Sequence, residues 1–108
     1  MQRYLIEFNY TPQASAAMIK NPGNRAEVLG PMIEAVGGKL ENYYFAIGAN
    51  IGYMVVSHPD QMSLNVATTA VFSGGAVTSI KATAIITAGE AVDVFKKVAS
   101  VAYQPPQE

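Results

Sequence analysis

The sequence predicts an α+β protein with the ferredoxin-like element order βαββαβ, followed by one more helix at the C-terminus. Three observations lead to this prediction. The chain has 108 residues, which is the usual size of one domain. Hydrophobic residues make up 50% of it, so a core can form without a metal or a disulfide. Segments whose apolar residues recur at every second position alternate with segments in which they recur every three or four positions.

The first strand and the two helices after it are marked by spacing and by capping residues. Large apolar side chains occupy the even positions of residues 3–10, which is strand spacing. Thr11 and Pro12 are typical of a helix N-terminus, and Asn24 can cap a second helix with an apolar stripe. Pro31 lies inside that second helix, so we expect it to kink or restart the helix.

The middle of the chain is predicted to form a β-hairpin and then a helix. Residues 40–47 and 51–57 are rich in aromatic and β-branched residues, and a short link that contains Gly48 joins them. Asp60 can cap the helix that follows, and the glycines at 74–75 are expected to end it.

A last strand and a last helix complete the pattern. Residues 77–87 are predicted to be a strand, and residues 87–90 have the T-x-x-E spacing of a capping box. The helix that begins there carries an apolar stripe that includes Phe95. Residues 104–108 contain two prolines and are predicted to be a tail, which leaves residues 1–103 as the single domain.

The predicted topology leaves one face of the sheet without cover. In this element order the antiparallel strands lie 4-1-3-2, and both main helices pack on the same face. Charged residues make up only 14% of the chain, which is few for the surface of a monomer of this size. We therefore expect the chain to associate with itself, as a homodimer or a higher homo-oligomer.

The composition argues against several kinds of function. Without cysteine, the chain has no disulfide, no thiolate nucleophile and no cysteine-ligated metal. Its 7 basic and 8 acidic residues are scattered, so nucleic acid is not an expected partner. No segment approaches the roughly 20 apolar residues of a membrane span, and no signal peptide is visible. We expect a cytoplasmic protein without a membrane partner.

Four stretches of the sequence resemble a known family. They are YYFAIG at 43–48, YMVVSHPD at 53–60, SGGAV at 73–77 and VAYQPP at 101–106. These stretches are similar to the GYD domain family, and the resemblance is ungapped from about Tyr4 to Pro106. It implies the ferredoxin-like fold and its pairing into a dimeric α/β barrel. The Tyr and Asp for which the family is named correspond to Asn50 and Ile51 here, so whatever that pair does elsewhere is in doubt in this chain.

Two charged residues are the candidates for acid–base chemistry. Glu7 lies on the polar face of the first strand, and Lys81 lies on the polar face of the last strand, which neighbours the first in this topology. They could meet as an ion pair inside the barrel. Burial would raise the pKa of Glu7 and make it a possible base, whereas a close Lys81 would lower that pKa again. A purely structural pair, or two solvated residues, is the alternative.

The candidates for ligand binding are polar and aromatic residues of the strands. Tyr43 and Tyr44 point to opposite faces of one strand, so one of them, with Tyr53, is expected to line a cavity with phenol groups. Asn9 and Ser79 lie on the polar faces of the first and last strands. The alternative for the tyrosines is aromatic packing at a dimer interface.

No metal site and no cofactor are predicted. His58 is the only histidine, so any haem or histidine metal site would have to use it. It stands between Ser57 and Pro59, where we expect an ordinary loop histidine. No phosphate-binding glycine loop or hydrolase motif occurs.

Three functions stay open, and whether the chain is an enzyme is among the open questions. The preferred one is a small dimeric α/β-barrel protein of unassigned function that binds an apolar or aromatic small molecule in the barrel interior. The second is a monooxygenase or isomerase that needs neither metal nor prosthetic group and uses Glu7, Lys81 or a tyrosine for proton transfer. The third is a purely structural, oligomer-forming protein.

Overall fold

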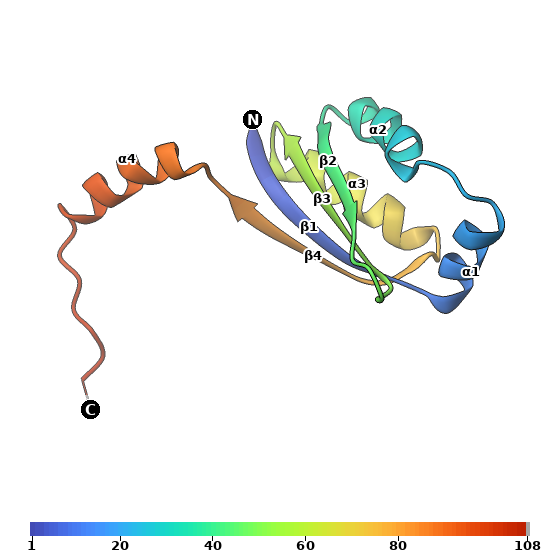
Figure 1. The fold of residues 1–108 in the computed structure, drawn as a ribbon. Helices are drawn as coiled ribbons and strands as arrows, with labels where there is room; N and C mark the ends of the chain where they lie inside the picture. Colours follow the sequence, from blue (N-terminus) through green and yellow to red (C-terminus); the bar gives the residue numbers. More distant parts are fainter. Residues whose placement is uncertain (108) are drawn as a thin grey trace.

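The computed structural model describes residues 1–107, and within them the chain forms a four-stranded antiparallel sheet and four helices (Figure 1). The elements are, in chain order, β1 (Gln2–Tyr10), α1 (Pro12–Lys20), α2 (Arg25–Ala35), β2 (Lys39–Phe45), β3 (Ile51–His58), α3 (Gln61–Ser73), β4 (Val77–Ile85) and α4 (Ala88–Val98). The predicted element order is confirmed. Glu108, the last residue of the predicted tail, lies outside the described residues.

The strands lie in the order β2-β3-β1-β4, which is the predicted 4-1-3-2 arrangement. β1 is central and pairs with β3 on one side and with β4 on the other. Glu7 stands opposite Tyr53 of β3 and opposite Lys81 of β4. Because directly opposed residues of an antiparallel sheet point to the same face, this register fixes which side chains can meet.

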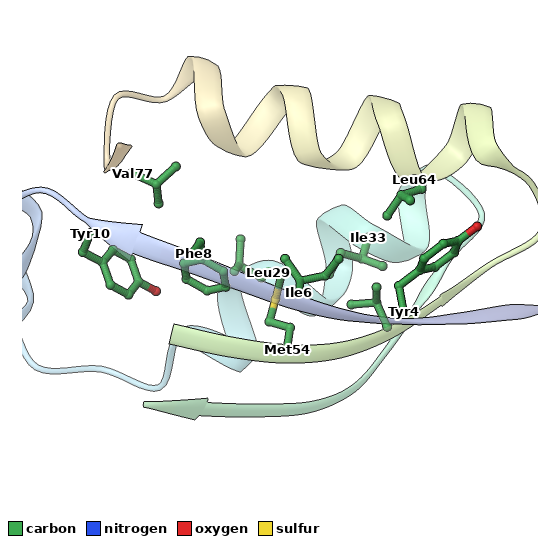
Figure 2. Close-up of a cluster of buried hydrophobic side chains, with 10 residues drawn as sticks. Tyr4, Ile6, Phe8, Tyr10, Leu29, Ile33, Met54, Leu64 and Val77 are labelled. Carbon is green, nitrogen blue, oxygen red and sulfur yellow. The ribbon is translucent and has the colours of Figure 1, made fainter. Parts of the chain in front are cut away.

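The hydrophobic core lies between the sheet and helices α2 and α3 (Figure 2). The even-numbered side chains of β1 from Tyr4 to Tyr10 point into it, as the alternation predicted. Its buried members are Tyr4, Ile6, Phe8, Tyr10, Leu29, Ile33, Met54, Val56, Leu64 and Val77. The other face of the sheet carries the odd-numbered side chains of β1 and no helix of residues 1–107 packs on it, and we call it the open face.

The four predicted capping residues all cap helices. The side chains of Thr11, Asn24, Asp60 and Thr87 each accept a hydrogen bond from a backbone N–H in the first turn of the helix that follows. At Thr87 the reciprocal bond of the capping box is also present. These bonds satisfy N–H groups that have no partner within a helix.

Pro31 does not restart α2, which runs as one helix from Arg25 to Ala35. Proline removes the hydrogen bond that the carbonyl of Glu27 would otherwise accept. Glu27 and Pro31 are both exposed, so water can take the place of the missing donor. The prediction of a restart is therefore wrong, whereas the alternative, a kink at Pro31, stays a prediction.

Helix α4 stands away from the rest of the molecule (Figure 1). It follows β4 outward, and Phe95 on its apolar side is 69% exposed. The radius of gyration is 17.3 Å, whereas a compact domain of this length is expected to have about 13 Å. The chain is thus a compact sheet-and-helix body with a helical arm.

Candidate functional site

Four of the predicted site residues form one row across the open face. Tyr44 of β2 stands opposite Tyr53 of β3, Tyr53 stands opposite Glu7 of β1, and Glu7 stands opposite Lys81 of β4. The row therefore presents two phenols, a carboxylate and an amine in sequence across all four strands. Groups of this kind can hydrogen-bond a ligand, and they include a potential proton donor and acceptor.

Asn9 and Ser79 lie in the next row and are joined to each other. Asn9 Nδ2 donates a hydrogen bond of 2.8 Å to Ser79 Oγ. The neighbour of Asn9 on the other side is Ile51 of β3. Of the candidate residues, only Tyr43 points elsewhere, since it stands opposite Met54 on the helix side. Tyr44, not Tyr43, therefore accompanies Tyr53.

Glu7 and Lys81 are neighbours in register, but among the described residues they form no ion pair. Lys81 is exposed and Glu7 is partly exposed. The ion pair on this sheet joins Arg3 Nε of β1 to Glu41 Oε2 of β2 at 2.8 Å. The hydrogen bond from Arg3 holds the pKa of the Glu41 carboxyl below its usual range. In the single chain, Glu7 is thus a carboxylate near solvent and not a buried base.

Tyr43 belongs to an aromatic cluster on the helix side of the sheet. Its hydroxyl is hydrogen-bonded to the hydroxyl of Tyr10. The ring of Phe8 meets Tyr10 and Tyr43 edge to face, at centroid distances of 5.1 and 5.7 Å. Phe45 stacks on Tyr10 at 5.8 Å. Such geometries are favourable for aromatic pairs.

Gly52 of β3 makes room for this cluster. A Cβ atom at Gly52 would lie 2.6 Å from Cε2 of Phe8 and 3.2 Å from Cε2 of Tyr10. Any side chain there would push the rings apart, so the glycine is required by close approach and not by a turn. A glycine inside a predicted strand is a sequence signal for such a close contact, but it does not identify the side chain that makes the contact.

His58 is fully buried at the end of β3, which corrects the expectation of an ordinary loop histidine. Ser63 Oγ donates to the Val36 carbonyl at 2.6 Å and lies 2.7 Å from His58 Nδ1. Since that hydroxyl proton is already used, Nδ1 must be the donor to Ser63 Oγ. Nε2 then carries a lone pair, and within residues 1–107 it has no partner.

Asn50 has a structural role that sequence reasoning did not specify. Its carbonyl accepts a hydrogen bond of 2.7 Å from the backbone N–H of Tyr10, and its Oδ1 accepts one of 3.0 Å from Ser15 Oγ. The residue therefore ties the β2–β3 turn to the end of β1 and to α1. That Asn50 and Ile51 replace the Tyr and Asp of a GYD motif stays a prediction.

Residues 1–107 contain no group of three or more His, Asp or Glu side chains arranged to hold a metal ion. Among the helices of that part of the chain, none combines the length and the hydropathy of a membrane span.

Comparison with known proteins agrees with this fold. The model of the GYD domain family matches residues 4–94, and the chain therefore belongs to that family. No functionally curated protein matches the chain.

Several solved structures share the fold, among them the following two. MtbAldR superposes with a TM-score of 0.56 at 17% identity, over 80% of this chain and 52% of its own. The chain therefore spans about half of that structure's length. An uncharacterized NIPSNAP domain protein from Burkholderia xenovorans gives a TM-score of 0.50 at 9% identity, over 82% of this chain and 95% of its own. At such identities the likeness concerns the fold alone.

Proposed function

We propose that two copies of the chain pair through the open faces of their sheets, and that the enclosed space binds an apolar or aromatic small molecule. The observation that carries the proposal is the character of the open face. Its residues include Leu5, which is 38% exposed, and Tyr44, which is 58% exposed. A sheet face that mixes aliphatic, phenolic and a few polar groups is typical of a surface that is covered by a partner and holds a ligand.

The arm supports the same proposal. Phe95 and Val98 of α4 are 69% and 60% exposed and make an apolar stripe that residues 1–107 do not cover. An amphipathic helix of this kind gains most of its stability from burial of that stripe. A second copy of the chain, paired through its open face, would bring further surface close to this stripe.

Pairing can be tested with one matched pair of variants. Leu5→Glu places a charge in the centre of the open face, whereas Val28→Glu places the same charge on α2, where the native side chain is 58% exposed. Sedimentation velocity at micromolar concentration should give a dimer for the native chain and for Val28→Glu, and a folded monomer for Leu5→Glu. A native chain that sediments as a folded monomer would contradict the proposal, and so would a Leu5→Glu variant that remains dimeric.

Ligand binding needs a separate experiment. Native mass spectrometry of the freshly purified protein would show a retained small molecule together with the stoichiometry. A neutral aromatic probe such as 2-naphthol should bind the native dimer, and Tyr53→Ala or Leu5→Glu should weaken that binding. If 2-naphthol binds the Leu5→Glu monomer as well as it binds the dimer, the ligand site is not in the interior of a paired barrel.

A further inference from the structure

A pocket lies on the helix side of the sheet, at the end where β1 finishes and β4 begins. It is bounded by residues of α2 from Arg25 to Met32 and by the end of α3, and its volume is about 290 Å³. Most of its wall is apolar and includes Leu29, Met32 and Val71. Tyr10 and Arg25 supply polar groups, and Arg25 is the charged residue of the lining.

Arg25 has no counter-charge in the described part of the chain. Its side chain is partly buried, and its Nε is out of contact with solvent and has no hydrogen-bond acceptor. None of the carboxylates of residues 1–107 forms an ion pair with it, including the exposed Glu27 on the same helix. Guanidinium groups that leave water are normally paired, since an unpaired buried charge is costly.

The phenols beside Arg25 do not neutralise it. Burial raises the pKa of Tyr43 well above its ordinary value, and burial also raises that of Tyr10. The nearby Arg25 acts in the opposite direction on both phenols, but it does not reverse the rise. Both hydroxyls thus stay protonated at neutral pH and can hydrogen-bond without carrying charge.

The position of Arg25 adds to the positive potential. It is the first residue of α2, an 11-residue helix, and Asn24 caps that helix. The N-terminal end of a helix carries a partial positive charge. The pocket therefore combines one full positive charge, a helix N-terminus and the phenol of Tyr10 with walls that are otherwise mostly apolar.

We propose that this pocket binds a small monocarboxylic acid with an apolar body. The carboxylate pairs with the Arg25 guanidinium, whose planar fork matches the two oxygens, and the body packs against Leu29, Met32 and Val71. One cation calls for one negative charge, and the volume is that of a site for a small ligand. The pocket is on the opposite side of the sheet from the open face, so it is distinct from the site between paired sheets.

Methionine methyl signals in NMR can report binding at this pocket. Met32 lines the pocket, whereas Met62 on α3 is 71% exposed and lies outside its lining. Titration of the full chain with benzoate or hexanoate should shift the Met32 signal and leave Met62 in place. Benzamide, which has the shape of benzoate without its charge, should bind at least about tenfold more weakly. Inorganic phosphate, which has no apolar body, should also be at least about tenfold weaker.

Matched variants test whether the positive charge of Arg25 is the one that binds the carboxylate. Arg25→Met should weaken benzoate binding by about tenfold or more. Lys39→Met removes one positive charge at the exposed start of β2 and should leave the affinity unchanged. Arg25→Lys keeps the charge but loses the fork, so it should fall between the native chain and Arg25→Met. If Arg25→Met does not fold, Arg25→Lys and the ratio of benzoate to benzamide affinity decide the question.

Several results would overturn the proposal. They are equal binding of benzoate and benzamide, equal binding of phosphate and benzoate, unchanged benzoate affinity in a folded Arg25→Met variant, and absence of a Met32 shift with both acids. Repeating the titration in Leu5→Glu separates this proposal from the previous one. Benzoate binding should persist in that variant whether or not the chain pairs through its open face.

Discussion

His58 is the residue that should contribute most clearly to a pH dependence of stability. Its ring is fully buried between Ser63 and the ring of Tyr4, whose centroid lies 6.4 Å away. Burial lowers the pKa of His58, and the nearby Asp60 carboxylate opposes this only in part. The folded state therefore prefers the neutral imidazole.

This preference predicts a loss of stability in mild acid. The unfolded chain takes up a proton near the ordinary histidine pKa of about 6.5, whereas the folded chain does so only at lower pH. The contribution of His58 to the free energy of unfolding should be complete above that pH and decline as the pH falls below it. Urea midpoints at pH 7 and pH 5 test this. His58→Gln should show a smaller change, and an equal change in both proteins would assign the effect to other groups.

Even a methyl group added at Gly52 is expected to destabilise the folded state. Gly52→Ala should lower the free energy of unfolding by about 1–3 kcal/mol, because its Cβ would overlap the ring of Phe8, which is 1% exposed and held by two tyrosines. Gly30→Ala is the matched control. A Cβ there meets nothing within 4 Å, and alanine in α2 should be neutral or stabilising. Equal denaturation midpoints for the two variants would show that the rings can move aside.

The coupling energy between Glu7 and Lys81 can show whether the open face is covered. In the single chain they are opposed but unpaired, so a double-mutant cycle of Glu7→Gln and Lys81→Met should give a coupling near zero in the Leu5→Glu background. If pairing of the sheets buries them, the same cycle in the native background should give up to about 1 kcal/mol. Coupling that is the same in both backgrounds would mean that association does not change their surroundings.

Among the elements, α4 is the one whose stability depends most on its own local sequence. The capping box of Thr87 and Glu90 closes its N-terminus with two hydrogen bonds of 3.0 Å. With little else to hold it, Thr87→Ala should cost α4 about 1 kcal/mol and increase amide hydrogen exchange over residues 91–98. Thr69→Ala, at an exposed position of α3, should leave exchange in α4 unchanged. Unaltered exchange in Thr87→Ala would contradict a role for the cap.

Local signals were sufficient to predict most elements. Alternation in β1 and capping residues at Thr11, Asn24, Asp60 and Thr87 depend on neighbours in sequence, and the structure agrees with them. The missed features depend on contacts between distant segments. Burial of His58 requires Ser63 and the carbonyl of Val36, and no periodicity reveals that meeting.

The arrangement of the candidate site across the whole molecule was also predictable only in part. Strand order follows from the element order, and it brings Tyr44, Tyr53, Glu7 and Lys81 into one row. The grouping of Arg25 with Tyr10 and Tyr43 was not foreseen, since it requires α2 to begin beside the ends of β1 and β2. A lone arginine at the start of a helix carries no signal of its own in the sequence.

The detached position of α4 has a consequence for how association can be observed. Isolated helices shorter than about 12–15 residues are marginal in water, and α4 has 11 residues. If a second copy covers its apolar stripe, α4 should lose its helical signal on dilution while the core of β1, α2 and α3 stays folded. The helical signal in far-ultraviolet circular dichroism, followed across a dilution series, would then measure self-association without any label. In that case the arm would make the secondary-structure content of this chain depend on its own concentration.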